Sequence, residues 1–348
     1  MIERNAEKGT GMQRFTRLAD VWRGDVLESR HWGIAAVSNA RGEVIAGWGD
    51  VDLVTYPRSS MKPFQALPLV ETGAADAFGL TERHLALACA SHRGEVHHTR
   101  LAGAWLKQTG FAIGDLACGP EYPKHLTTQH AMIARGEAPS SLHHNCSGKH
   151  AGFLSVCRHC GHDPMGYDQM EHPTQQAYAG LLNDLGTRVT GWGIDGCTLP
   201  TPALSLADAA RIGALMSAAK GPHGPAMRRV VDAMRACPEY TSGSDHAMVA
   251  VTKATRGRVT FKVGAEAFLL AFLPEDGLGV AIKVADGNSR ARVPALLAIL
   301  QGLGVMDKRA VADLQHWIEP QVRDSRGHVV GALKPSAGLS KPRETAPA

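Results

Sequence analysis

Residues 258–287 read RVTFKVGAEAFLLAFLPEDGLGVAIKVADG and alternate short apolar runs with turn residues. A glycine at 264 and the sequence Pro-Glu-Asp-Gly at 274–277 divide the stretch. Short apolar runs bounded by such residues are typical of strands, and tight turns join consecutive strands in antiparallel order. The stretch therefore predicts an antiparallel meander towards the end of the chain.

A second pair of apolar runs lies near the start of the chain, in HWGIAAVSNARGEVIAGWGD at 31–50. The runs flank Asn39-Ala40-Arg41-Gly42, which predicts a β-hairpin. Helical spacing with start and stop signals predicts helices between and after these strands. They fall at 59–73 (with a kink or early end at Pro68), at 173–186, from Ser205 onward, at 225–236 and at 291–304. Strands at both ends with helices between them predict an α/β fold of the α+β type, with a central antiparallel sheet flanked by helices.

The ends of the chain differ from the region between them. Residues 1–22 mix charges of both signs and lack the apolar segment of a secretory signal, which predicts a flexible extension. Residues 336–348 are polar and rich in Pro and Ala, which predicts a disordered tail. No low-complexity linker interrupts residues 23–335, so we expect one domain there, as a single body or as two closely coupled lobes.

The composition excludes several classes of protein. A 44% hydrophobic and 20% charged chain of 348 residues can bury a sizeable core. The net charge of +4 comes without a dense Lys/Arg run, which does not fit a nucleic-acid footprint. No stretch approaches the roughly 18 apolar residues of a membrane span. Seven cysteines without an export signal predict reduced thiols or metal ligands, so we expect a cytoplasmic protein.

The first candidate catalytic pair is Ser59 and Lys62, at the mouth of a predicted helix. A spacing of three puts both side chains on one helical face, within hydrogen-bonding reach. A lysine kept neutral by burial can take the proton of a serine, whose hydroxyl is otherwise a poor nucleophile. A capping serine with a surface lysine has the same spacing, so the pair alone does not decide the chemistry.

Two segments combine thiol and polar side chains around glycines. In HHNCSGKH at 143–150, Cys146 offers a thiolate, which is a soft ligand for zinc, and a neighbouring histidine could join it. In GWGIDGCTLPTP at 191–202, Cys197 could be a second soft ligand, with Asp195 in the first or second ligand shell. A structural loop with satisfied histidines is the alternative interpretation of the first segment.

Two further motifs are weaker on local evidence. CASHRGE at 89–95 follows an apolar run, and polar groups at such a point can form the floor of a pocket, although a plain capped loop fits as well. Cys157 and Cys160 form a C-x-x-C pair that could bind zinc or act in redox chemistry. The apolar run before them indicates the last turn of a helix, where free cysteines often serve as core residues.

Five motifs in a fixed order resemble the L-asparaginase II family of the rhizobial type, over about residues 25–335. They are R-S-S-x-K-P at 58–63, C-A-S-H-x-G-E at 89–95, N-C-S-G-K-H at 145–150, D-G-C-x-L-P-T-P at 195–202 and K-x-G-A-E at 262–266. Each motif alone is weak, whereas five in register are specific. The resemblance implies a fold similar to serine β-lactamases and glutaminases, usually in a homodimer.

The resemblance also implies three sets of site residues. The catalytic set is two Ser–Lys tandems, Ser59 with Lys62 and Ser91 with Lys262. The metal set, for a zinc near the substrate, is Cys146, Lys149 and Cys197. The substrate-binding set is Arg58, His92, Asn145 and Asp195. A lysine must be neutral to donate its lone pair to a metal, so this ligand set needs thiolates and burial to outweigh protonation.

Two positions depart from the family's pattern. A histidine is common after Cys118-Gly119, whereas Pro120-Glu121-Tyr122-Pro123 follows here, and the usual G-A-E-G ends in Ala267. Both departures leave the tandems and the metal ligands intact and bear on substrate preference.

These inferences predict an L-asparaginase that hydrolyses the side-chain amide of L-asparagine to L-aspartate and ammonia, with Ser59 favoured over Ser91 as nucleophile. The alternatives are a glutaminase or another acyl-transfer enzyme of the same architecture, a zinc-binding protein without turnover, and a redox switch through Cys157 and Cys160. Two intact Ser–Lys pairs favour an enzyme, since a binding module has little need of them.

Overall fold

The computed structural model describes residues 14–341. Its centre is an eight-stranded sheet with the order β10-β11-β1-β2-β9-β8-β7, in which β3 also pairs with β2. All these pairs are antiparallel. The strands are β1 (Thr16–Arg23), β2 (Val26–Ser38), β3 (Val44–Trp48), β7 (Thr260–Val263), β8 (Phe268–Leu273), β9 (Leu278–Val284), β10 (Gln321–Arg323) and β11 (Val329–Pro335). The predicted central antiparallel sheet, made from both ends of the chain, is confirmed.

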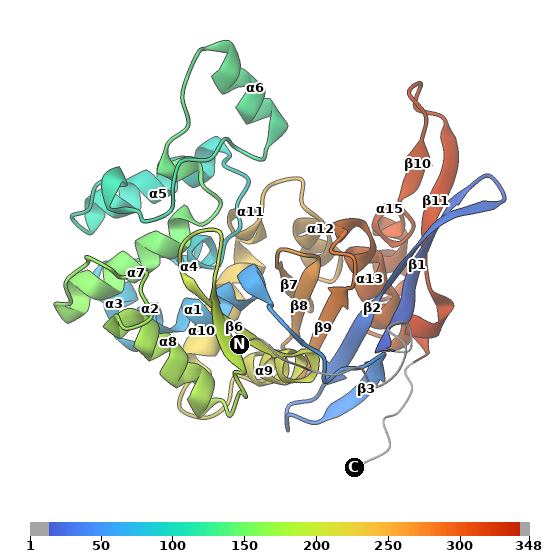
Figure 1. Cartoon of the computed structure of the whole chain (residues 1–348), viewed down its shortest axis with the longest axis horizontal. Helices are drawn as coiled ribbons and strands as arrows, with labels where there is room; N and C mark the ends of the chain where they lie inside the picture. The colour runs from blue at the N-terminus through green and yellow to red at the C-terminus, as the bar shows by residue number, and fades with distance from the viewer. Residues whose placement is uncertain (1–13, 342–348) are drawn as a thin grey trace, which may run out of the picture.

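The helices lie beside and against this sheet (Figure 1). The segments up to the meander are the 3₁₀ turn η2 (Arg58–Met61), α1 (Lys62–Gln65), α2 (Leu67–Glu71), α3 (Ala74–Ala77), α4 (Glu82–Ala88), α5 (Val96–Gln108), α6 (Leu126–Ala134), α7 (Ser147–Cys160), α8 (Pro173–Asp184), α9 (Leu206–Ala218), α10 (Gly224–Ala236), α11 (Pro238–Thr241) and α12 (Ala247–Ala254). After the meander come α13 (Arg292–Gly302), α14 (Lys308–Asp313) and α15 (Gln315–Ile318). Short 3₁₀ turns also occur at Ile113–Asp115, Ser141–His143, Ser289–Ala291 and Ala337–Ser340.

A small second sheet lies within the helical part. It has the order β4-β6-β5, with β4 (Val54–Thr55), β6 (Pro200–Ser205) and β5 (Gly191–Ile194). Because β4 leads directly into η2, and β5 is joined to β6 through residues 195–199, this sheet brings two of the predicted motifs near each other.

The predicted hairpin and meander are both present. Asn39 and Glu43 close the turn between β2 and β3, through a backbone hydrogen bond of 2.9 Å. Every residue of β8 is buried, since β8 pairs with β7 and β9 and packs against α9. The predicted helix at 59–73 is divided into η2, α1 and α2, with Ala66 between the last two, as expected for a segment with prolines at 63 and 68.

The structure corrects the predicted ends. Residues 16–22, assigned to a flexible extension, belong to β1, where Val21 is buried between β2 and β11. Residues 337–340, assigned to a disordered tail, form a 3₁₀ turn in which Leu339 is buried against the core. Apolar side chains within otherwise polar termini explain both differences. The remaining parts of the two predictions, 1–13 and 342–348, lie outside the described residues.

The helix predicted at 291–304 is present as α13, but it is followed by α14, α15, β10 and β11, which the sequence analysis missed.

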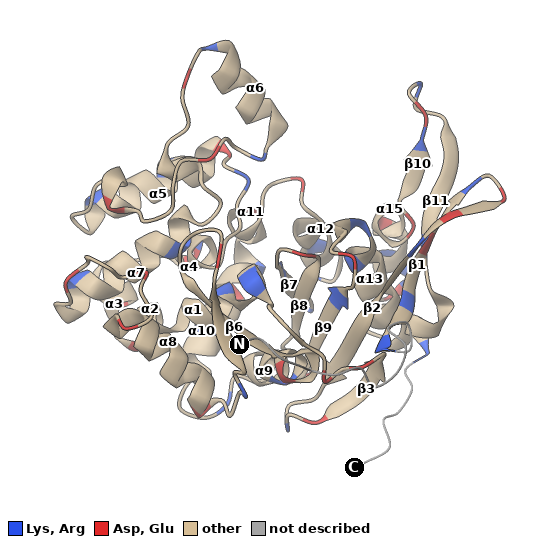
Figure 2. Cartoon of the chain, in the orientation of Figure 1, with Lys and Arg blue, Asp and Glu red and all other residues tan. Residues whose placement is uncertain are grey.

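Basic and acidic residues are distributed over many elements (Figure 2). Within residues 14–341, no helix is long and apolar enough to cross a membrane.

Candidate functional site

The predicted motifs meet where the helical part joins the edge strand β7. Lys62 begins α1 and Lys262 lies within β7, and both side chains are buried. Ser91 follows α4, which ends at Ala88 and so releases the chain into the loop 89–95. Ser60 joins the two parts, since its Oγ donates a 3.0 Å hydrogen bond to the carbonyl of Lys262.

Ser91 lies between the two lysines. Lys62 Nζ is 3.0 Å from Ser91 Oγ and also donates to the carbonyl of Ala90. Lys262 Nζ is 2.8 Å from the same Oγ and donates to the carbonyl of Val263 at 2.9 Å. One hydroxyl therefore contacts two lysine nitrogens, which is the arrangement expected of a serine that exchanges its proton with a lysine base.

The other expected pair is not joined in the same way. Within the described chain, Ser59 Oγ makes no hydrogen bond, and Lys62 extends to Ser91 instead. Ser59 is half-buried, and its backbone carbonyl accepts from the amide of Lys62 at the junction of η2 and α1. The structure thus brings Lys62, Ser91 and Lys262 together, with Ser59 in the same segment as Lys62.

The environment of Lys262 favours a neutral amine. Burial, followed by the nearby charge of Lys62, holds the pKa of Lys262 well below its ordinary value. Since an amine must be unprotonated to accept a proton, this shift suits Lys262 to act as a general base towards Ser91.

Cys146, Lys149 and Cys197 form a buried cluster next to the lysine pair. Lys149 Nζ is 2.9 Å from Cys197 Sγ, and Lys62 Nζ is 3.1 Å from Cys146 Sγ. Contact with Cys197, together with the charges of both lysines, lowers the pKa of Cys146 well below its usual value, although burial opposes this. Burial disfavours the Lys149 ammonium, but its interactions with Cys197 and Cys146 outweigh burial and raise the pKa of that lysine.

This cluster has the donors expected of a metal site. Thiolates are soft ligands that zinc prefers, and the buried Nε2 of His150 has no hydrogen-bond partner among the described residues. The Nδ1 of His150 lies 2.6 Å from the hydroxyl of Tyr167, which fixes the ring. A bound cation would lower the pKa of Lys149, as a lysine ligand requires. The donor set therefore fits a metal ion.

Three of the predicted substrate-binding residues contact one another or the cluster. Arg58 donates from Nε and Nη2 to Asp195 Oδ1, at 2.9 Å and 2.6 Å. Burial alone would raise the pKa of Asp195, but Lys149 and Arg58 together lower it, so the carboxylate is charged. Asn145 Oδ1 lies 2.9 Å from Cys146 Sγ.

His92 is placed differently from the expectation of a pocket-lining residue. Its Nδ1 accepts from the amide of Gly94 at 3.1 Å, and its Nε2 lies 2.9 Å from Ser147 Oγ. Burial, with the nearby His98, lowers its pKa well below the usual value, so the ring is neutral. Both ring nitrogens are thus occupied, and His92 joins the loop after α4 to the start of α7.

Sequence reasoning missed two residues of this region, Glu121 and Cys118. His150 is one of the histidines of the segment 143–150 that the sequence offered as possible ligands beside Cys146. Glu121 was noted only as a departure from the family pattern; its Oε2 lies 3.4 Å from Asn145 Nδ2. Cys118 is buried beside Cys146 and Cys197, and burial raises its pKa to about 12. Its isolated position in the sequence gave no signal.

A second group of metal-binding residue types lies in the first turn of α5. Glu95, His97 and His98 offer ligand atoms that all lie within 4.8 Å of one another. The carboxylate of Glu95 already accepts from the amide and hydroxyl of Ser244, at 2.9 Å and 2.7 Å. Both ring nitrogens of His98 are also hydrogen-bonded, to Glu95 N and Glu239 O. A metal here would have to displace these bonds, so the cysteine cluster is the better candidate.

The C-x-x-C pair lies in the last turn of α7, as expected. Cys157 is buried and Cys160 exposed, and both are free thiols. Burial raises the pKa of Cys157 to about 12, which disfavours a reactive thiolate.

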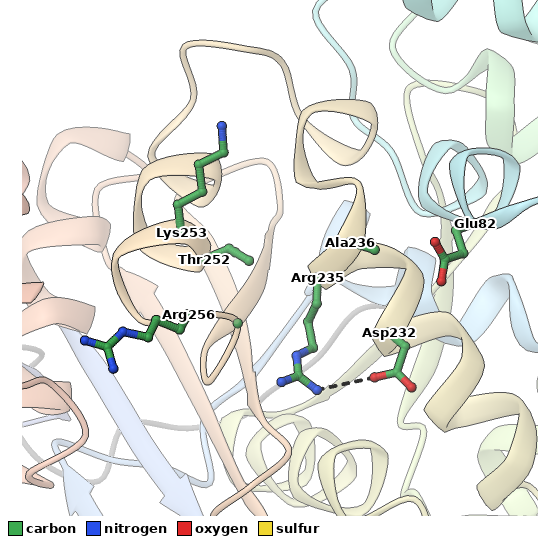
Figure 3. A pocket seen from close by; sticks show the side chains of 8 residues that line it. Glu82, Asp232, Arg235, Ala236, Thr252, Lys253 and Arg256 are labelled. Atoms are coloured by element: carbon green, nitrogen blue, oxygen red, sulfur yellow. Dashed lines mark hydrogen bonds and ion pairs between the residues drawn. The ribbon is translucent and has the colours of Figure 1, made fainter.

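A surface hollow of about 580 Å³ lies away from these motifs, between α10 and α12 (Figure 3). Arg235, which lines the hollow, pairs with Asp232 at 3.3 Å and with Glu275 at 3.0 Å. None of the five sequence motifs lines this hollow, so we do not place the chemistry there.

Comparisons with known proteins bear on the whole chain. The family model of L-asparaginase II matches residues 19–335, a range that includes every candidate residue named above. A search of curated proteins gave no match.

Among solved structures, Mglu in its tris and glutamate form is similar, with 16% identity and a TM-score of 0.38, over 79% of this chain and 59% of that chain. A β-lactamase from Mycobacterium bovis is similar with 16% identity and a TM-score of 0.39, over 82% of this chain and 95% of that chain. This chain therefore spans 59% of the length of the Mglu chain.

Proposed function

The chain belongs to the L-asparaginase II family, and from this premise we propose that it hydrolyses the side-chain amide of L-asparagine to L-aspartate and ammonia. The family supports an amidohydrolase with a small-molecule amide substrate. The observation that carries the finer proposal is the position of Ser91 Oγ, 3.0 Å from Lys62 Nζ and 2.8 Å from Lys262 Nζ.

In the proposed first half-reaction, Ser91 Oγ attacks the amide carbon while Lys262 Nζ takes the hydroxyl proton. Lys62 Nζ, which donates to the same oxygen, stabilises its developing charge. The carbon–nitrogen bond breaks and the proton passes from Lys262 to the departing nitrogen, so that ammonia and a β-aspartyl ester of Ser91 result. The sequence favoured Ser59 as nucleophile. The contacts of Ser91 with the two lysines favour Ser91 as the nucleophile. The hydroxyl of Ser59 is then available to donate a hydrogen bond to the substrate.

In the proposed second half-reaction, Lys262 takes a proton from water, and the resulting hydroxide attacks the ester carbon. The carbon–oxygen bond breaks, the proton returns to Ser91 Oγ, and L-aspartate is released. The same amine acts as base in both halves, which requires that it stay neutral between them.

We further propose that Cys146, Lys149 and Cys197 hold a zinc ion, with His150 close enough to take part. When bound, zinc would supply a fixed positive charge that orients the anionic groups of the substrate. Arg58 and Asp195 would position the substrate beside it. The family resemblance also leads us to propose a homodimer.

The deciding experiment is ammonia release from L-asparagine by the wild type, Ser91→Ala and Ser59→Ala. We expect Ser91→Ala to lose at least about 10³-fold in kcat, because a nucleophile has no substitute. Labelling with a diazoketone analogue of asparagine, followed by peptide mass mapping, should place the adduct on Ser91. An adduct on Ser59 would return the nucleophile to the residue that the sequence favoured, with Ser91 as proton relay.

The same assay with L-glutamine tests the alternative of a glutaminase, and with a chromogenic β-lactam it tests another acyl-transfer enzyme of the same architecture. Turnover of either compound, without release of ammonia from L-asparagine, would contradict the proposed substrate.

Metal analysis of the purified protein tests the zinc site. We expect about one zinc per chain in the wild type and a loss of bound metal in Cys146→Ser and Cys197→Ser, because each removes one thiolate. His97→Gln, in the other group of ligand types, serves as the matched control and should keep its metal. Loss in His97→Gln alone would move the site to Glu95, His97 and His98.

A further inference from the structure

Glu121 lies on the segment 119–125, which leads from Cys118 to α6 (Figure 1). Arg93 fastens this segment to the loop of Ser91. The guanidinium of Arg93 donates to the carbonyl of Lys124 at 2.9 Å, and the amide of His125 donates to the carbonyl of Arg93 at 2.9 Å. The segment that carries Glu121 is therefore attached to the loop at Arg93, two positions along the chain from Ser91.

A single side chain separates Glu121 from the cysteine cluster. Asn145 donates from Nδ2 to Glu121 Oε2 at 3.4 Å, and its Oδ1 lies 2.9 Å from Cys146 Sγ. Cys146 Sγ in turn contacts Lys62 Nζ, the partner of Ser91. Glu121 thus belongs to the wall of the candidate site.

The carboxylate of Glu121 is poorly satisfied by these neighbours. A distance of 3.4 Å is long for a hydrogen bond. The Nε2 of His144 is 4.0 Å from Glu121 Oε2, which is beyond hydrogen-bonding distance. Lys124 lies 3.2 Å away but is exposed, and such surface pairs contribute little. Glu121 therefore keeps acceptor capacity for a cation.

Asp195 is the other carboxylate near the cluster, and it is engaged. Its Oδ1 accepts twice from Arg58 and once from the amide of Gly196, at 2.8 Å. Both guanidinium nitrogens bond this one oxygen, so the positive charge of Arg58 lies directly against the carboxylate of Asp195.

We infer that Glu121 binds the α-ammonium group of the substrate and so selects amides that carry a primary amine. This inference rests on the proposed function, since L-asparagine is a zwitterion. Its α-carboxylate suits the lysines and the metal, whereas its α-ammonium needs an anion. Glu121 is the carboxylate of the described site without a strong cationic partner.

The test measures binding rather than turnover, so that it stays separate from the assay of ammonia release. Calorimetry on Ser91→Ala protein compares L-asparagine with succinamic acid, which is the same molecule without the amine. We expect L-asparagine to bind about 10- to 100-fold more tightly, the usual range for a hydrogen bond to a charged group. Adding Glu121→Gln should bring this ratio close to one, chiefly by weakening L-asparagine.

Glu137→Gln is the matched control, since Glu137 pairs with Arg135 beyond α6. It should leave the ratio unchanged. A ratio that survives Glu121→Gln, or that collapses only in Asp195→Asn, would overturn the inference while ammonia release still supported the proposed function. Equal weakening of both compounds by Glu121→Gln would also overturn it, because a merely structural role acts on both.

Discussion

At the scale of single residues, left-handed backbone gathers beside the candidate site. The residues concerned are Arg58 (φ 54°), Thr198 (φ 80°), Glu266 (φ 53°) and Ala267 (φ 55°). They adjoin Ser59, Cys197 and the turn that follows Lys262. Non-glycine residues in this conformation are strained, and such strain collects where a side chain must be aimed. The neighbourhood of Lys62, Ser91 and Lys262 thus combines strained backbone with two buried lysine side chains.

The buried Lys262, which the proposed reaction needs as a base, should lower the free energy of unfolding at neutral pH. Its folded pKa lies below the unfolded value, so the unfolded chain binds more protons between the two, and the stability of the native state rises with pH through that window. We expect Lys262→Met to abolish turnover and to raise the free energy of unfolding at pH 7 by about 1–3 kcal/mol. Urea denaturation at pH 7 and pH 10 checks this, since the gain should shrink at the higher pH.

Lys253→Met, at an exposed site on α12, is the control. It should leave turnover unchanged and should change the free energy of unfolding by no more than about 0.5 kcal/mol at either pH. A less stable Lys262→Met at pH 7 would mean that the buried amine is a well-satisfied cation.

At the scale of elements, the approach of α9 to β9 sets how the helical part meets the sheet. Gly279 on β9 faces the backbone of α9, where an added Cβ would lie 2.3 Å from both Ala210 O and Ala214 N. Gly213, on the facing side of α9, allows the same closeness. Backbone atoms cannot move aside as a flexible side chain can, so this contact is fixed by the two glycines.

Gly279→Ala should therefore lower the free energy of unfolding by about 3 kcal/mol, the upper part of the range for overpacking. Gly180→Ala is the matched control, because this exposed glycine of α8 has no atom within 4 Å of the new Cβ. It should raise stability by about 0.5–1 kcal/mol, through helix propensity. Chemical denaturation of both variants decides. Equal effects would show that α9 can shift away from β9.

At the scale of the whole molecule, the sequence predicted the sheet better than it predicted the site. Alternating runs and turn residues are local signals, so the meander and the hairpin were predictable, as was their common sheet. That Lys62 pairs with Ser91 and not with Ser59 could not be predicted, because it depends on which hydrogen-bond acceptors lie near the buried Nζ of Lys62. Lys62 finds them at Ala90 and Ser91, across a tertiary contact that no local spacing encodes.

The end of the chain was predicted least well. The strand β10 has three residues, and residues 336–340 contain few apolar side chains, so their patterns were too short to read. Their order comes from the partner strands and from the core under Leu339. The contact of Glu121 with Asn145 was hidden for a related reason, since the segment 119–125 has no periodic pattern.

The long reach of the Ser91–Lys262 contact has a consequence for synthesis. The two residues are 171 positions apart, so at usual rates of translation the lysine leaves the ribosome roughly ten to thirty seconds after the serine. Until β9 has also been made, the backbone edge of β2 that pairs with β9 lacks its hydrogen-bonding partner. Until synthesis is nearly finished, the nascent protein therefore lacks the Ser91–Lys262 contact and exposes an unpaired strand edge that can pair with other chains. Its yield in the cell should depend on chaperones that shield the first strands.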